Sequence, residues 1–193
     1  MEKFVNLKNI AEVKIGLFLG RKKQNQNDKK GFEYDVVSLQ SFFDEKGIFD
    51  GSITNKIILC EELDKKQCEK FLVKKGDILI RTRNPVTAVL VDKNYKKLIF
   101  SDLFIRVRNL NRYNPKLLVE YFNTCSEQEY GSCKRTTVNS VAKFKIPNLS
   151  LDEQKEIIKS MKKYDSKNKK LQEQILKNNE LKKNILRELK DKK

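Results

Sequence analysis

The sequence predicts a mixed α+β protein, in which a compact domain with short strands is followed by a long C-terminal helix. Short apolar stretches alternate with turn residues up to position 149, a helix-start signal follows at Ser150, and neither proline nor glycine occurs beyond it. We therefore expect a domain over residues 1–149 and a helix over residues 150–193. About 150 residues are enough to bury a hydrophobic core.

The start of the C-terminal helix is encoded locally. Pro147 has no backbone N–H and biases the preceding residue towards an extended conformation, so a short strand should end there. Ser150 and Glu153 then have the spacing of a capping box, in which each side chain bonds the backbone of the other residue. A helix of about 40 residues would be ~60 Å long.

The predicted helix carries a narrow seam whose members are spaced alternately by four and three residues. This spacing is typical of a coiled coil. The seam contains Ile157, Met161, Tyr164, Asn168, Leu171, Ile175, Asn178, Lys182, Ile185 and Leu189. Its polar members are expected to fix the register and orientation of the pairing.

The seam is best matched by an antiparallel copy of itself. In that arrangement Asn168 lies opposite Asn178, apolar members face apolar members, and Tyr164 meets Lys182 as a tolerable cation–aromatic pair. A parallel pairing would instead place Lys182 against Lys182. We therefore expect an antiparallel homodimer, and the alternative is a seam that packs on another protein or on its own domain.

The charge balance favours a polyanionic partner. The 193 residues carry a net charge of +16, and 35% of them are charged. Double-stranded DNA is the partner we expect, and a merely solvated basic surface is the alternative. No apolar run approaches the ~20 residues of a membrane-spanning helix, and the first residues lack the apolar core of a signal peptide. We expect a cytoplasmic protein without membrane association.

The composition argues against intrinsic catalysis. The chain has no histidine, which removes the common acid–base and nucleophilic constellations. Its cysteines, Cys60, Cys68, Cys125 and Cys133, form no Cys-x-x-Cys pair, so we expect reduced thiols and no metal site. No Gly-rich phosphate loop is present, and we expect no cofactor.

The domain should consist of short elements separated by polar segments. We expect a helical turn at residues 7–11, helical structure at 60–69, and a helix from Pro115 to about Asn123. Polar basic loops are expected at 20–31 and 131–140. Extended segments are expected at 32–39, 78–80, 86–91, 98–100, 103–107 and 141–146.

The order of several segments resembles one repeat of the DNA specificity (S) subunit of type I restriction-modification systems. The most specific part is the Ile-Pro…Leu-x-Glu-Gln…Ile passage within residues 145–158, which enters the long helix. Further similarity lies in residues 73–81 (VKKGDILIR), 100–103 (FSDL) and 134–138 (KRTTV). The likeness covers essentially the whole chain.

The resemblance implies a non-catalytic subunit that directs methyltransferase and, when present, restriction-translocase subunits to a bipartite DNA site. Such subunits usually carry two target-recognition domains, each followed by a helix, and the two helices pack antiparallel. This chain has one predicted domain and one helix, so it resembles a half-subunit. Two copies would then read an inverted repeat with an unspecific gap.

The best candidates for DNA contacts combine cations with side chains that can read base edges. Arginine reads guanine and amides read adenine, while lysine neutralises phosphates. The candidates are Arg21, Lys22, Lys23, Gln24 and Asn25 in the first basic loop, Arg81 and Arg83 after a strand, and Lys134, Arg135, Thr136 and Thr137 in the second basic loop.

Two other classes of function remain open from the residues alone. One is a stand-alone DNA-binding or adaptor protein without methyltransferase partners. The other is a metal-dependent nuclease, which would need carboxylates such as Asp77 and Asp102. The Gly76-Asp77 pair has the character of a turn that leads into a strand, which does not favour the nuclease.

Overall fold

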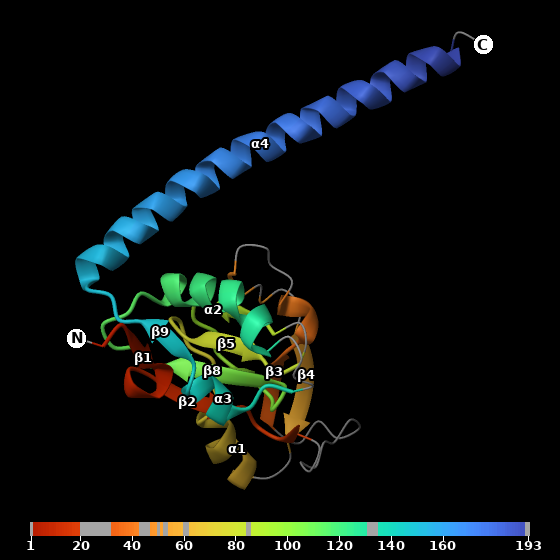
Figure 1. Cartoon of the computed structure of the whole chain (residues 1–193). Coiled ribbons are helices and arrows are strands. Elements are labelled where there is room, and N and C mark those ends of the chain that lie inside the picture. The colour runs from red at the N-terminus through yellow and green to blue at the C-terminus, as the bar shows by residue number, and fades with distance from the viewer. Residues whose placement is uncertain are drawn as a thin grey trace. The chain divides into compact units, whose positions relative to one another are not determined.

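The computed structural model describes residues 2–19, 32–42, 47–49, 51, 54–59, 62–83, 86–130 and 135–191. The chain divides into two compact units, Met1–Leu149 and Ser150–Lys193. The first contains strands and short helices, and the second is one long helix (Figure 1). The predicted mixed α+β class is therefore confirmed.

A four-stranded antiparallel sheet forms the centre of the first unit. Its strand order is β2 (Glu12–Ile15), β8 (Phe104–Arg108), β5 (Ile78–Arg81) and β6 (Ala88–Leu90). Every neighbouring pair is antiparallel. All of β5 except its last residue is buried, as expected for an apolar strand inside a sheet.

A second sheet has three strands in the order β4 (Thr54–Leu59), β3 (Phe32–Val37) and β7 (Leu98–Ile99). Strand β3 pairs antiparallel with β4 and parallel with β7. A separate ladder joins β1 (Phe4–Asn6) to β9 (Lys145–Pro147). This ladder ties the start of the described chain to the last strand of the domain.

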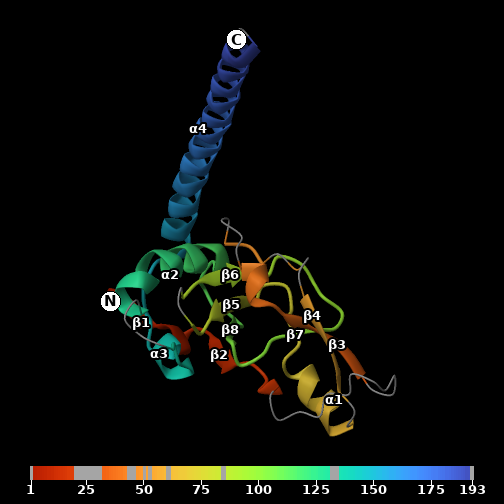
Figure 2. The same ribbon diagram turned by 90° about the vertical axis from the view of Figure 1, so that its right-hand side faces the viewer.

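Short helices complete the first unit. They are the 3-10 helices η1 (Leu7–Asn9) and η3 (Leu39–Phe42) and the α-helices α1 (Glu62–Glu69), α2 (Pro115–Tyr130) and α3 (Val138–Ala142). Figures 1 and 2 place α2 and α1 on opposite sides of this domain. The Asn123 amide of α2 bonds both the N–H and the C=O of Ala88 in the outer strand β6, at 2.7 and 2.9 Å.

The hydrophobic core lies where the two larger sheets meet. One cluster takes Val37 from β3, Leu79 from β5, Val89 from β6, Leu98 from β7 and Phe104 from β8. Each such side chain contributes about 1.5–3 kcal/mol when it is fully removed from water. The core therefore fixes the segments that leave these strands.

The second unit is helix α4 (Leu151–Asp191), which has 41 residues. The predicted capping box is present, because Glu153 N donates to Ser150 Oγ at 3.3 Å and Ser150 N donates to Glu153 Oε2 at 2.7 Å. Hydrogen bonding of the Glu153 carboxyl to the Ser150 side chain, followed by that to the Ser150 backbone N–H, lowers its pKa. Within the described residues, no helix is both long enough and apolar enough to cross a membrane.

The structure corrects several expected elements of the domain. Residues 138–142 form α3 and not part of a loop and an extended segment, because the Thr137 side chain caps a helical turn there. Residues 54–59 form β4, where no strand was expected, because pairing with β3 along its whole length supports this half-polar segment. Helix α2 continues to Tyr130 and does not end near Asn123.

Candidate nucleic-acid interface

Three segments that are distant in sequence meet at the end of strand β5. Thr82 donates to the carbonyl oxygen of Leu103 from both N and Oγ1, each at 3.0 Å. Thr136 N donates to Thr82 O at 2.7 Å. We call residues 81–83, 101–103 and 135–137 the arginine junction, because these bonds bring the segments of Arg81, Arg83 and Arg135 together.

The burial of the junction alternates along its segments. Thr82 and Thr136 are fully or almost fully buried, at 0% and 2% exposure. Their neighbours Arg83, Arg135 and Thr137 are exposed. Two inward threonines therefore hold together two short segments on which Arg83 and Arg135 are exposed, which suits a surface that binds a polyanion.

Arg135 is attached to Asp102 at two points. Its Nη2 donates to the Asp102 carbonyl oxygen and to Asp102 Oδ2, both at 3.2 Å. The Arg135 side chain is 48% exposed and that of Asp102 is 24% exposed. The guanidinium is thus oriented by its partner and remains accessible from outside.

The strand that leads towards the first basic loop is fixed to the same junction. Asp102 N donates to Leu17 O at 3.0 Å, and Leu17 also forms an isolated bridge with Ser101. A Cβ placed on Gly16 would lie 2.1 Å from Ser101 O, so this close approach requires glycine. The described chain at Leu17 therefore lies beside Ser101 and Asp102.

Two buried polar atoms of the junction lack a hydrogen-bond partner among the described residues. They are Nε of Arg81 and Oγ1 of Thr136. A buried donor or acceptor that remains unpaired costs about 1–3 kcal/mol. These two atoms could thus form hydrogen bonds that no described residue supplies.

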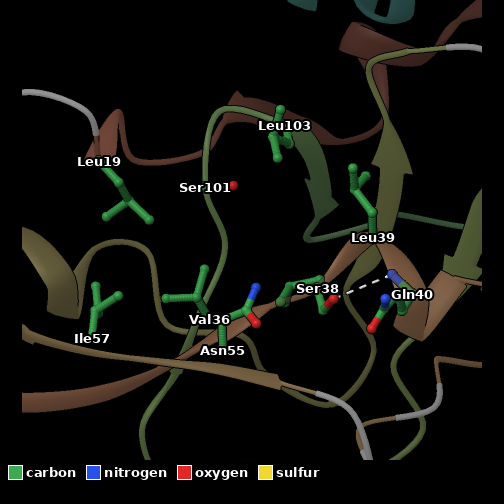
Figure 3. A pocket seen from close by; sticks show the side chains of 10 residues that line it. Leu19, Val36, Ser38, Leu39, Gln40, Asn55, Ile57, Ser101 and Leu103 are labelled. Atoms are coloured by element: carbon green, nitrogen blue, oxygen red, sulfur yellow. Dashed lines mark hydrogen bonds between the residues drawn. The ribbon is translucent and has the colours of Figure 1, made fainter.

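A cavity of about 410 Å³ is lined in part by Ser101 and Leu103, from the turn at 101–103 (Figure 3). Its wall is mainly apolar, and the amides of Gln40 and Asn55 add polar groups. Gln40 N donates to Ser38 Oγ at 3.2 Å. The full lining is Leu19, Val36, Val37, Ser38, Leu39, Gln40, Asn55, Ile57, Ser101 and Leu103.

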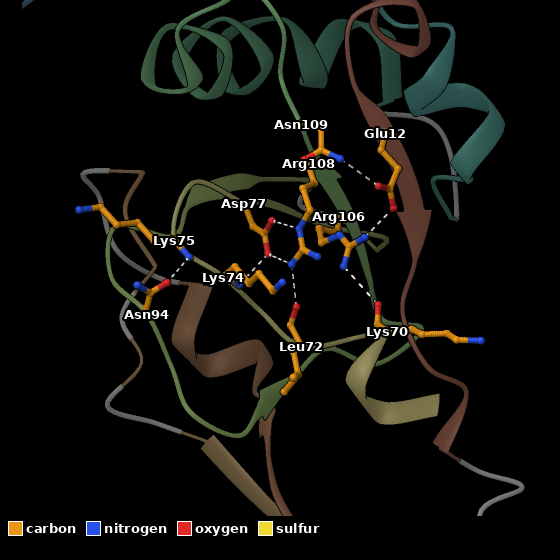
Figure 4. Close-up of polar contacts among 10 residues, drawn as sticks. All are labelled: Glu12, Lys70, Leu72, Lys74, Lys75, Asp77, Asn94, Arg106, Arg108 and Asn109. Atoms are coloured by element: carbon orange, nitrogen blue, oxygen red, sulfur yellow. Dashed lines mark hydrogen bonds and ion pairs between the residues drawn. The ribbon is translucent and has the colours of Figure 1, made fainter. Parts of the chain in front are cut away.

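A separate polar network lies between β2, β8 and the turn before β5 (Figure 4). The Asp77 carboxylate accepts hydrogen bonds from Arg108 Nε at 2.6 Å and from Arg108 Nη2 at 2.7 Å. Its Oδ2 also accepts from Lys74 N at 2.8 Å. Hydrogen bonding to Asp77 raises the pKa of Arg108. Asp77 therefore serves the structure of this turn.

The same network holds Arg106, which is only 2% exposed. Its Nη2 donates to Glu12 Oε1 at 2.7 Å, and its guanidinium lies 5.4 Å from the centre of the Phe100 ring. Burial, followed by the charge of Arg108, lowers the pKa of Arg106. The only sequence signal for this network was a pair of arginines, Arg106 and Arg108, at alternate positions of an apolar strand.

Comparison with known families identifies the chain. The family model described as type I restriction modification DNA specificity domain matches residues 2–183. The chain belongs to this family. The resemblance found in the sequence is thus confirmed, and no curated protein matches the chain.

Solved structures share the fold of this specificity domain. The crystal structure of the HsdS subunit from Thermoanaerobacter tengcongensis superposes with a TM-score of 0.59 at 17% identity, covering 85% of this chain and 37% of that one. A chain from work on the structural basis of complex assembly and conformational transition of the type I R-M system gives 0.60 at 14% identity, covering 85% and 38%. The specificity domain spans less than two fifths of either.

The predicted contact residues have different positions in this specificity domain. Arg81, Arg83, Arg135, Thr136 and Thr137 all belong to the arginine junction. Thr136 is buried, and Thr137 Oγ1 accepts from Ser140 N at 3.2 Å as the cap of α3. Residues that lie outside the described part of the chain are Arg21, Lys22, Lys23, Gln24, Asn25 and Lys134.

Potential metal ligands do not gather in the described part of this specificity domain. No group of three or more acidic, cysteine or histidine side chains suited to a metal ion occurs among those residues. Cys68 and Cys125 are free thiols, whereas Cys60 and Cys133 lie outside the described residues. The carboxylate of Asp77 is engaged by Arg108, which leaves the nuclease reading without support from that residue.

The predicted seam of α4 carries large apolar side chains that are exposed within its own unit. Those described as exposed are Ile157, Tyr164, Leu171 and Ile175. The side chains of Ile185 and Leu189 lie outside the described residues, although their backbone is helical. Leu176 and Leu181 are also exposed and lie off the seam, which sequence reasoning passed over.

Proposed function

We propose that this chain is a non-catalytic half-subunit that gives DNA sequence specificity to a cytoplasmic type I restriction-modification complex. Two copies pair through antiparallel α4 helices and read a bipartite inverted repeat. The dimer recruits methyltransferase subunits and, where present, restriction subunits. The family match supports the specificity role, and the exposed apolar residues of the α4 seam support the pairing of two copies.

The observation that carries the dimer is the seam of α4. Leu171 and Ile175 are 47% and 58% exposed, although large apolar side chains on one helix face normally pack against another surface. The antiparallel register centred on Glu173 places Leu171 opposite Ile175 and Asn168 opposite Asn178. A coiled coil of this kind would hold two recognition domains at a fixed separation.

The DNA-reading part of the proposal rests on the arginine junction. Arg83 and Arg135 are exposed on segments that Thr82 and Thr136 hold in place. Arginine on a rigid segment can donate to guanine O6 and N7 in the major groove. The net charge of +16 supplies the sequence-independent attraction to phosphates.

Selection from a random double-stranded DNA library tests the function. The full chain is purified together with the methyltransferase subunit of its own cell, and the bound sequences are determined. We expect an inverted repeat with a constant gap. A reproducible but asymmetric consensus contradicts the homodimer, and the absence of any enriched sequence contradicts the specificity role itself.

Disulfide cross-linking tests the orientation of the helices. A chain carrying Met161→Cys and Ile185→Cys should form an intermolecular link between positions 161 and 185, which mass spectrometry can locate and distinguish from links through native cysteines. A chain with Met161→Cys alone is the matched control and should not link 161 to 161. Efficient linkage of that control would show a parallel pairing.

A further inference from the structure

We infer that Asp102 is a positioning residue for base reading, because it orients the guanidinium of Arg135 towards DNA. The inference rests on the proposed function, since it assigns a role within the same DNA-reading surface. Its starting point is the two-point attachment of Arg135 Nη2 to the Asp102 carbonyl oxygen and Oδ2, both at 3.2 Å.

Both bonds use the same nitrogen of Arg135. Nε and Nη1 therefore have no bond to another described residue and remain available as donors to an outside ligand. The Arg135 side chain is about half exposed, so such a ligand can reach it. Guanine offers two acceptors, O6 and N7, on its major-groove edge, and arginine is the side chain that reads them most often.

Asp102 is itself held firmly. Its backbone N donates to Leu17 O at 3.0 Å, and the neighbouring Leu103 carbonyl accepts from both N and Oγ1 of Thr82. On the other side, Gly16 packs so closely on Ser101 that not even a Cβ fits between them. The turn therefore cannot shift freely, and it provides a fixed anchor for a long side chain.

The backbone of Arg135 is held to the same anchor. Thr136 N donates to Thr82 O at 2.7 Å, and Thr82 in turn bonds Leu103. Both ends of the Asp102–Arg135 pair thus belong to one hydrogen-bonded unit. An isolated ion pair between two mobile surface side chains would lack these backbone hydrogen bonds, and such pairs contribute little to stability.

An acidic residue on a DNA-binding surface has a second consequence. Its negative charge repels phosphates, so Asp102 should weaken sequence-independent binding while it improves discrimination between bases. Removing the Asp102 carboxylate should therefore strengthen sequence-independent binding and weaken discrimination between bases. Damage to the fold would lower both, so the sign of the change separates the two explanations.

The experiment uses the full chain with its methyltransferase subunit and the DNA site selected by the wild type. Arg135→Ala first identifies the base position that Arg135 reads, as the position whose preference is lost. Asp102→Ala should reduce discrimination at that position by about 5- to 100-fold and leave other positions unchanged. Its affinity for a random-sequence duplex should stay equal or rise.

Four further variants complete the test. Asp102→Asn keeps an acceptor for Nη2 and should retain discrimination, whereas Asp102→Ser, which suits a turn but is too short, should behave as Asp102→Ala does. In the Arg135→Ala background, Asp102→Ala should add no further loss. Glu33→Ala, which removes the acid of the exposed Lys56 pair, should leave the consensus unchanged.

Three results would overturn the inference while the proposed function stands. They are unchanged discrimination in Asp102→Ala and Asp102→Ser, an even loss at all base positions, and no position that depends on Arg135. If the wild-type chain selects no sequence at all, the proposed function fails and this inference fails with it.

Discussion

Arg108 donates two parallel hydrogen bonds to Asp77, from Nε to Oδ1 at 2.6 Å and from Nη2 to Oδ2 at 2.7 Å. The pair connects the end of β8 to the turn before β5, and Asp77 is 1% exposed. Each partner also forms a further hydrogen bond. Lys74 N donates to Asp77 Oδ2, and Arg108 Nη2 donates to Leu72 O. This network supports the strand that ends at Arg81.

Asp77→Ala should strongly destabilise the domain. It would leave the partly buried Arg108 guanidinium without its carboxylate, and breaking a buried pair in this way costs about 3–5 kcal/mol. The free energy of unfolding measured by urea denaturation checks this. The matched control is Glu33→Ala, which breaks the exposed 2.6 Å pair with Lys56 and should change the free energy of unfolding much less. Equal decreases in the free energy of unfolding of the two variants would show that the buried Asp77 pair stabilises the domain no more than the exposed Glu33 pair.

Gly16→Ala should destabilise the contact between the segment after β2 and the Ser101–Leu103 turn. The added Cβ would lie 2.1 Å from Ser101 O and 2.6 Å from Phe100 O, so backbone must move. Overpacking of this kind costs about 1–3 kcal/mol. Thermal unfolding checks the loss.

The control for Gly16 is Gly76→Asn. Gly76 has a φ of +90° and no atom near its Cβ position, and asparagine tolerates such a conformation better than other residues with side chains. Gly76→Asn should lower the stability measured by thermal unfolding less than Gly16→Ala does. A harmless Gly16→Ala would contradict the close approach of these two segments.

Thr137→Ala should lower the stability of α3 and of the β9 segment that follows it. Thr137 Oγ1 accepts from Ser140 N at 3.2 Å, and Thr137 N donates to Ser140 Oγ at 3.0 Å. Loss of an N-cap side chain costs about 1 kcal/mol. Thr137→Ser retains the hydroxyl and should lose much less, as measured by hydrogen exchange of the α3 amides. Similar losses for both variants would argue that the methyl group, and not the cap, matters.

Local signals in the sequence predicted those elements that depend on neighbouring residues. The start of α4 is the clearest case, because Pro147, Ser150 and Glu153 determine it within one turn. Strand β4 had a weaker signal, since its first half, Thr54 to Lys56, is polar and the strand depends on its pairing with β3. Helix α3 is so short that its cap decides whether it forms.

The candidate site was predictable as a set of residue types but not as an arrangement. Arginine and threonine at positions 81–83 and 135–137 were visible as basic segments. Their contact through Thr82 and Thr136 depends on tertiary packing, which no local pattern encodes. The contact of Asp102 with Arg135 was hidden for the same reason, because an aspartate between Ser101 and Leu103 does not reveal a partner 33 residues away.

Tyr113 should make the stability of the domain depend on alkaline pH. Burial, followed by the influence of Tyr121, raises the pKa of its hydroxyl to about 12. Below pH 10 the hydroxyl is protonated in both the folded and unfolded chains. Between about pH 10 and 12 only the unfolded chain ionises it, so stability falls as pH rises, by up to about 3 kcal/mol.

The variant Tyr113→Phe isolates this contribution, since lysines titrate in the same pH range. The difference in free energy of unfolding between wild type and variant should be constant below pH 10. It should then change in favour of the variant as pH rises towards 12. A difference that stays constant throughout would mean that Tyr113 ionises equally easily in the folded chain.

Ile175→Lys should dissociate the proposed homodimer, whereas Leu176→Lys should not. The two residues are adjacent and similarly exposed in the described chain, at 58% and 64%. They differ by about 100° around the helix, so only Ile175 lies on the seam, where the proposed pairing places it opposite Leu171 of the other copy. A lysine at this position would be placed against an apolar side chain.

Sedimentation equilibrium of the two full-length variants distinguishes the outcomes. Lysine is a good helix former, so neither variant should lose helix content by circular dichroism. We expect the mass of one chain for Ile175→Lys and of two chains for Leu176→Lys at the same concentration. If Leu176→Lys dissociates the pair and Ile175→Lys does not, the seam is wrongly placed, and the contact face lies about a quarter of a turn away on the side of Leu176.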